Sequence, residues 1–116
     1  METLTIYHNP RCSKSRQALA LLEERKVPLR IVEYLKDPPS RQELATLRTQ
    51  LGLAPKEWIR KGEEAFRTAR LSLDAAEDTL LDAMAKHPVL IERPIVVRGK
   101  RAVVGRPPER VLELLE

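Results

Sequence analysis

Short apolar runs and one helical pattern alternate along the first forty residues. Residues 4–7 (LTIY) form a β-prone run that His8-Asn9-Pro10 ends. Apolar side chains at helical spacing predict a helix over residues 13–25, and the β-branched residues of 29–34 predict a second strand. Strand, helix and strand in about thirty residues make a βαβ unit, so we expect the two strands to be parallel.

The next segment begins with helix-start chemistry. Ser40 and Glu43 have the spacing of a capping box, and Gly52 lies where the following helix should end. Residues 55–70 are polar and less regular, and they predict a short helix through Trp58.

Helical spacing returns at Leu73 and continues to His87-Pro88, which should stop the helix. Together, residues 38–87 therefore predict a layer of helices inserted after the βαβ unit.

The last quarter of the chain predicts a hairpin and a helix. Two β-branched runs, 95–98 and 101–104, flank the turn residues Gly99-Lys100. Pro107-Pro108 then opens a predicted helix over 109–115. The whole order is β-α-β, a helical insert, then β-β-α, which indicates an α/β fold with a mixed sheet in a single domain, residues 1–116.

Composition narrows the chemistry. The chain has 116 residues and one cysteine, which excludes an intrachain disulfide, a Cys-x-x-Cys pair and any multi-cysteine metal site. No signal-peptide pattern or long apolar stretch is present, so we expect a soluble, cytoplasmic protein that does not associate with a membrane. Any thiol chemistry must take its second sulfur from another molecule.

The charge is basic but modest. The formal net charge is +4, and 14 of the 21 basic residues are arginine. No Lys/Arg run exceeds two residues and the four aromatic side chains are dispersed, which argues against nucleic-acid binding. No spacing of His, Cys, Asp or Glu predicts a metal site, and no glycine-rich nucleotide loop is present, so we expect no bound cofactor.

Cys12 lies where the first strand passes into the first helix. Unpaired N–H groups at a helix N-terminus favour an anion, and basic side chains lie nearby in the sequence, so this thiol can ionise more readily than an ordinary one. The alternative is a small buried apolar side chain. Against it, residues 8–15 are polar apart from Pro10 and Cys12.

Three arginines complete a candidate oxyanion site. Arg93 precedes the first hairpin strand and Arg106 follows the second, so a closed fold can bring both to one edge, and Arg60 is the third candidate. Guanidinium groups suit tetrahedral oxyanions, although most arginines are solvated surface residues. His8 is either a polar loop residue or a hydrogen-bonding partner near Cys12.

The chain resembles the glutaredoxin-dependent arsenate reductases of the thioredoxin superfamily over nearly its whole length. Arg11 and Ser13-Lys14-Ser15 around the cysteine are similar to a chromosomal branch of that family. The matching residues are Ile6-Tyr7-His8-Asn9-Pro10, Cys12, Ser15-Arg16, Tyr34-Leu35, Pro38-Pro39-Ser40-Arg41, Glu43-Leu44, Arg60-Lys61, His87-Pro88, Leu90-Ile91, Arg93-Pro94-Ile95-Val96-Val97 and Arg106-Pro107.

This resemblance implies a thioredoxin-like, three-layer α/β/α architecture and a catalytic mechanism. Cys12 corresponds to the nucleophile and His8 to a histidine that helps activate it, whereas Pro94 and Ser15 are expected to have structural roles at the site. The anion-binding arginines correspond to Arg60, Arg93 and Arg106. In the family's scheme the thiolate attacks arsenate, glutathione forms a mixed Cys–As–glutathione species, and glutaredoxin regenerates the enzyme as arsenite leaves.

Two other functions remain open. The same fold serves non-enzymatic regulators that bind RNA polymerase, although these generally carry a Cys-x-x-Cys switch where this chain has Ser15. A thiol reductase of the same fold with a different substrate is the second alternative. Pro94 is trans by the general preference of X-Pro bonds, or cis and facing the cysteine if the thioredoxin-like interpretation holds.

Overall fold

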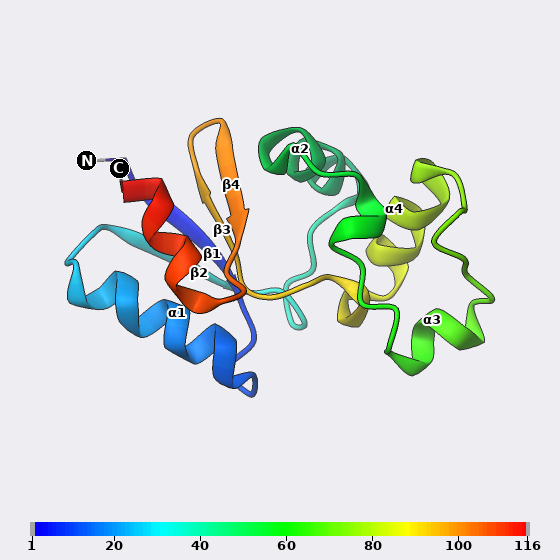
Figure 1. Ribbon diagram of the computed structural model, residues 1–116, viewed down its shortest axis with the longest axis horizontal. Coiled ribbons are helices and arrows are strands. Elements are labelled where there is room, and N and C mark those ends of the chain that lie inside the picture. Colours follow the sequence, from blue (N-terminus) through cyan, green and yellow to red (C-terminus); the bar gives the residue numbers. More distant parts are fainter. Residues whose placement is uncertain (1, 116) are drawn as a thin grey trace. The chain divides into compact units, whose positions relative to one another are not determined.

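The computed structural model describes residues 2–115, so both end residues of the predicted 1–116 domain lie outside the description. The chain divides into two compact units (Figure 1). The sheet unit contains the residues up to Asp37 and those from Arg93 onward, and the helical unit is Pro38–Glu92. The insert was expected at 38–87, and the helical unit continues five residues further. The single-domain assignment stays a prediction.

The sheet unit is built on four strands in the order β2-β1-β3-β4. β1 pairs in parallel with β2, whereas β3 is antiparallel to both β1 and β4. This confirms the mixed sheet, the parallel βαβ unit and the hairpin around Gly99-Lys100. The strands are β1 (Leu4–His8), β2 (Leu29–Glu33), β3 (Ile95–Arg98) and β4 (Arg101–Val104).

Two helices complete the sheet unit. α1 (Ser13–Glu24) follows β1 as expected, and η3 (Pro108–Leu115) follows β4. The sequence pattern predicted an α-helix here, but η3 is a 3₁₀ helix. The N–H of Arg110 donates to the carbonyl of Pro107, three residues back, which is the 3₁₀ pattern.

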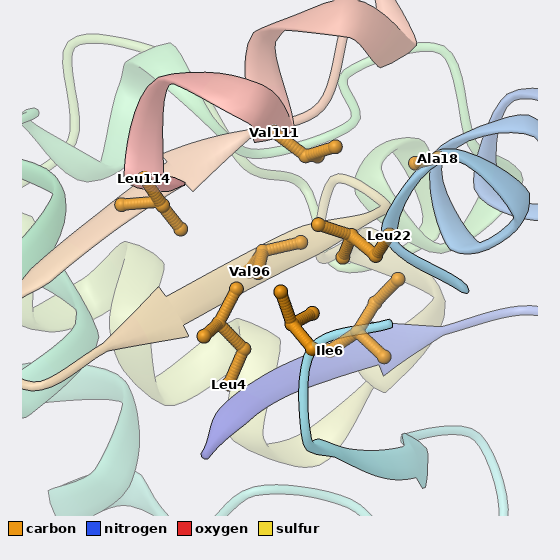
Figure 2. Packing of buried hydrophobic residues seen from close by; sticks show 8 residues of the cluster. Leu4, Ile6, Ala18, Leu22, Val96, Val111 and Leu114 are labelled. Atoms are coloured by element: carbon orange, nitrogen blue, oxygen red, sulfur yellow. The ribbon is translucent and has the colours of Figure 1, made fainter. Parts of the chain in front are cut away.

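The core of the sheet unit lies between the sheet and these two helices. Leu4 and Ile6 alternate with half-buried residues along β1, so both face the same side, where Val96 of the neighbouring strand joins them. Figure 2 shows Leu22 of α1 and Val111 of η3 pointing into the same cluster. α1 and η3 therefore cover the same face of the sheet.

The helical unit forms where the sequence places its caps. Ser40 and Glu43 make the reciprocal hydrogen bonds of a capping box, and Gly52 ends α2 in the left-handed conformation with φ of 66°. Both predictions are confirmed. The elements of this unit are α2 (Arg41–Leu51), η1 (Pro55–Glu57), α3 (Glu64–Thr68), α4 (Glu77–Lys86) and η2 (Pro88–Leu90).

In the helical unit one expectation was wrong in detail, and one short helix was not predicted. The last long helix was expected from Leu73, but α4 begins at Glu77. Ser72 accounts for the difference, because its hydroxyl and carbonyl accept the N–H groups of Asp74 and Ala75 in a turn that competes with helix formation. The five-residue helix α3 lies in a stretch whose polarity gave no periodic signal.

In the part of the chain that the structure describes, no helix combines the length and the apolar character needed to cross a membrane.

Candidate active site

A tight turn delivers Cys12 to the start of α1. The carbonyl of Asn9 accepts the N–H of Cys12 at 3.0 Å, and the side-chain Oδ1 of Asn9 accepts the N–H of Arg11 at 3.0 Å. Cys12 is the N-cap of α1, and its own carbonyl accepts the N–H of Arg16. This confirms the position that the sequence predicted, at the passage from strand to helix.

Two opposing effects set the pKa of the Cys12 thiol. Partial burial raises this pKa, because it disfavours the charged thiolate. The backbone N–H of Ser15, the side chain of Arg93 and the backbone N–H of Lys14 act in the other direction and outweigh the burial. The pKa therefore lies below its ordinary value, and the half-buried sulfur is still reachable from solvent.

Arg93 and Arg106 both reach Cys12. Nη1 of Arg106 lies 4.0 Å from the sulfur and donates to the carbonyl of Arg93 at 3.1 Å. The positive charge and hydrogen bonding of Arg93 lower the Cys12 pKa. The structure thus brings together two of the three predicted arginines, as their places on either side of the hairpin suggested.

Pro94 and Gly105 fix the spacing of these arginines. The Arg93-Pro94 and Arg106-Pro107 peptide bonds are both cis, which answers the question that the sequence left open for Pro94. The N–H of Gly105 donates to the carbonyl of Pro94 at 2.8 Å, and a Cβ on Gly105 would lie 2.8 Å from Cγ of Pro94. Only glycine allows the end of β4 to approach this closely.

His8 acts on the site through Ser15. Its Nδ1 lies 2.6 Å from Oγ of Ser15, which also accepts the N–H of Asn9 at 3.0 Å. Both side chains are buried. Burial is the main reason that the His8 pKa is lowered, so the ring is neutral at pH 7. His8 and Ser15 together hold the loop before Cys12 in place.

Beside this loop lies a small cavity of about 180 Å³. The parallel strands β1 and β2 end there, with His8 opposite Glu33, and the carboxyl edge of parallel strands is where such folds bind ligands. Its lining adds the apolar Leu35 and the cations Arg11 and Lys36 to the loop residues.

Arg60 belongs to the helical unit and lies in a different environment. Its Nε is 3.0 Å from Oε1 of Glu63, and its Nη1 is 2.6 Å from Oε1 of Glu92. The sequence singled out Arg60 but missed both carboxylates. The spacing of three residues between Arg60 and Glu63 was a visible signal, whereas the contact with Glu92 depends on the tertiary fold.

No role at the site was predicted from the sequence for Asn9 or Gly105. Asn9 could have been read as a turn former before Pro10, but Gly105 gave no signal beyond closing the hairpin. Across residues 2–115, no three side chains of His, Cys, Asp or Glu gather in a way that could hold a metal ion.

Comparison with known proteins identifies relatives over the full length. The ArsC family profile matches residues 7–114. A protein of Neisseria meningitidis serogroup A named arsenate reductase is 44% identical over 119 residues, which cover 99% of this chain and 100% of its own.

Two solved structures share the fold. One, named arsenate reductase from Vibrio cholerae, superimposes with a TM-score of 0.92 at 47% identity and covers 97% of both chains. The other, named putative arsenate reductase from Yersinia pestis, has a TM-score of 0.88 at 49% identity and covers 95% of this chain and 98% of its own. These neighbours confirm the thioredoxin-like α/β fold.

Proposed function

The chain belongs to the ArsC family, and from this premise we propose that it reduces arsenate to arsenite, using the Cys12 thiolate as nucleophile and glutathione and glutaredoxin as reductants. One observation supports this most strongly. The only cysteine is the N-cap of α1, has a lowered pKa and lies 4.0 Å from the Nη1 of Arg106. A thiolate beside guanidinium groups is suited to attack an oxyanion.

Arg93 and Arg106 would bind the oxygens of arsenate while the sulfur attacks arsenic. Guanidinium groups match tetrahedral oxyanions in shape and charge, and the N–H groups at the start of α1 add donors for the developing negative charge. Arg60 is the third arginine of the site by resemblance to the family, and its role stays a prediction.

The proposed reaction balances with external thiols. Attack of the thiolate forms a sulfur–arsenic bond, and an arsenate oxygen leaves as water after protonation. Glutathione displaces a second oxygen, again as water, to give Cys12–S–As–S–glutathione. A glutaredoxin thiolate then attacks the glutathione sulfur, so that a disulfide forms and the electron pair of the arsenic–sulfur bond remains on arsenic, reducing As(V) to As(III). Water finally releases arsenite and the free thiol.

The count of cysteines supports this scheme. A chain with one cysteine cannot resolve an arsenic adduct by forming its own disulfide. In the proposed scheme the reductant comes from solution, and we propose a cytoplasmic location, where glutathione is kept reduced. In this scheme His8 and Ser15 are positioning residues, because they fix the loop that carries Cys12.

The test is a coupled assay of arsenate reduction with glutathione and glutaredoxin. We expect the native protein to form arsenite, Cys12→Ser to form none, and Ser13→Ala, at the neighbouring exposed position, to keep its activity. Omitting either reductant should stop turnover. Equal arsenite formation by the native protein and Cys12→Ser would rule out Cys12 as the nucleophile.

Trapping of a mixed disulfide and a pull-down from lysate, together with this assay, separate the alternatives. A protein that forms a mixed disulfide with glutaredoxin but reduces no arsenate would be a thiol reductase with another substrate. If the native protein and Cys12→Ser retained RNA polymerase subunits from a lysate equally well, and the native protein had no reductase activity, the protein would be a regulator.

A further inference from the structure

The environment of Arg60 differs from that of a vacant anion-binding arginine. Two of its nitrogens, Nε and Nη1, contact the carboxylates of Glu63 and Glu92 at 3.0 and 2.6 Å. The side chains of Arg60, Glu63 and Glu92 are only 23%, 28% and 22% exposed. These contacts are therefore better shielded from water than ordinary surface ion pairs.

The backbone builds this arrangement into the helical unit. The N–H of Arg60 donates to the carbonyl of Leu90 at 2.7 Å, and the N–H of Glu92 donates to the carbonyl of Trp58 at 3.0 Å. These bonds flank the bridge between Ile59 and Ile91, two buried residues. The backbone hydrogen bonds between these two segments therefore hold Arg60 and Glu92 next to each other.

Charge makes this arrangement unfavourable for a bare anion. One guanidinium and two carboxylates carry a net charge of −1, and the carboxylates already accept from two of the five N–H donors of Arg60. Lys56 and Lys61 also line this cavity, so the unfavourable charge is local to the contacts of Arg60. Burial lowers the Arg60 pKa and hydrogen bonds to Glu63 and Glu92 raise it, with the net effect of a raised pKa, so Arg60 stays protonated in this cluster.

We propose that Glu63 and Glu92 are specificity-determining residues that restrain Arg60, so that an oxyanion binds there only by displacing a carboxylate or by donating a proton to it. The inference rests on the proposed function, in which Arg60 contributes to oxyanion binding. Arsenate and phosphate keep a proton at neutral pH and can donate it to a carboxylate, whereas sulfate has none. The pair therefore disfavours sulfate more than arsenate.

The chain offers a matched control for this idea. Glu57 lines the same cavity of about 480 Å³ as Arg60, Glu63 and Glu92, but its carboxylate accepts the N–H of Ala54 at 2.8 Å instead. Glu57→Gln removes one negative charge from the cavity and keeps an acceptor for that N–H. It separates the contact with Arg60 from the general effect of charge.

The experiment follows the Nε–H resonance of Arg60 by NMR during titration with sulfate, and with phosphate as an unreactive analogue of arsenate. Loss of the signal in Arg60→Lys assigns it. We expect Glu63→Gln and Glu92→Gln each to lower the apparent Kd for sulfate about fivefold, with a smaller gain for phosphate and no gain in Glu57→Gln. Circular dichroism checks that each variant is folded.

Several results would overturn the inference. One is that sulfate shifts the Arg60 resonance in no variant. Another is that the sulfate affinity is unchanged in both Glu63→Gln and Glu92→Gln. The third is that Glu57→Gln gains as much sulfate affinity as these two variants. Equal gains for sulfate and phosphate would overturn the discrimination between them. Failure of the native protein to reduce arsenate would instead overturn the proposed function, because this titration requires no turnover.

Discussion

Arg106 of the sheet unit and Arg60 of the helical unit are the same residue type in opposite electrostatic situations. Arg106 is exposed, and its Nη1 contacts a thiol sulfur and a carbonyl oxygen. Arg60 is mostly buried and is held by two carboxylates. The guanidinium of Arg106 lies against the thiol, where it can stabilise a thiolate, whereas the charge of Arg60 is balanced by two carboxylates. The residue type identifies arginines as candidate anion-binding residues, and the groups that contact each arginine determine whether it can bind an anion.

The largest expected effect separates the two arginines by activity and stability. Arg106→Ala should raise the KM for arsenate about ten- to a hundredfold, the loss expected for a charged hydrogen bond, and change the free energy of unfolding by less than about 0.5 kcal/mol. Arg60→Ala leaves two shielded carboxylates without their cation, so it should lower that free energy by about 1–2 kcal/mol. Coupled kinetics and urea unfolding measure the two quantities.

Arg93→Ala addresses the thiol directly, since Arg93 lowers the Cys12 pKa. Titration by the ultraviolet absorbance of the thiolate should show a raised pKa in Arg93→Ala. If Arg106→Ala and Arg60→Ala lowered the free energy of unfolding equally, the contrast between the two environments would be wrong.

The next effect compares a glycine from each unit. A Cβ on Gly105 would lie 2.8 Å from both Pro94 Cγ and Val111 Cγ1, whereas one on Gly62 would meet nothing within 4 Å. Gly105→Ala should therefore lower the free energy of unfolding by about 1–3 kcal/mol and impair arsenate reduction, because the strand end that positions Arg106 must move. Gly62→Ala should leave both unchanged.

Urea unfolding and the coupled assay measure this pair of variants. A Gly105→Ala protein as stable and active as the native one would show that the close approach to Pro94 does not position the site.

The smallest effect concerns the buried His8. Burial lowers the His8 pKa below its ordinary value of 6.5, so below pH 6.5 the unfolded chain binds a proton at this residue before the folded chain does. The contribution of His8 to stability is fully present above pH 6.5 and is lost as the pH falls toward the lower folded value. His8→Gln should flatten the decline in unfolding free energy between about pH 7 and 5.

Unfolding free energies of the native protein and of His8→Gln, measured across this pH range, check the prediction. An identical decline in His8→Gln would show that burial of His8 does not contribute to the pH dependence.

Local signals predicted much of the fold. Ser40, Glu43 and Gly52 set the ends of α2 through contacts within a few residues of each other, and Gly99 placed the hairpin turn. The start of α4 and the 3₁₀ form of η3 were missed, because each depends on which of several competing local hydrogen bonds forms. The position of Cys12 at the start of α1 was also predicted correctly, because a helix N-terminus is determined by residues close together in the sequence.

The site required more than local signals. The places of Arg93 and Arg106 around the hairpin predicted that they could meet, but only the sheet order β2-β1-β3-β4 brings their segments beside the end of β1. The contact between His8 and Ser15 likewise joins residues on a strand and a helix. The sequence predicted a loop before Cys12, but it did not predict the contacts that hold this loop.

The sequence by itself determined the order of the strands and long helices and the single thiol at a helix start, because capping, turn chemistry and residue counts act over short stretches of chain. Only the tertiary structure decided which charged groups surround each candidate residue. It places Arg93 and Arg106 against the thiol, and it places Arg60 between the carboxylates of Glu63 and Glu92. Electrostatic energy depends on distances through space, and for Glu92, thirty-two residues beyond Arg60, the chain order carries no such distance.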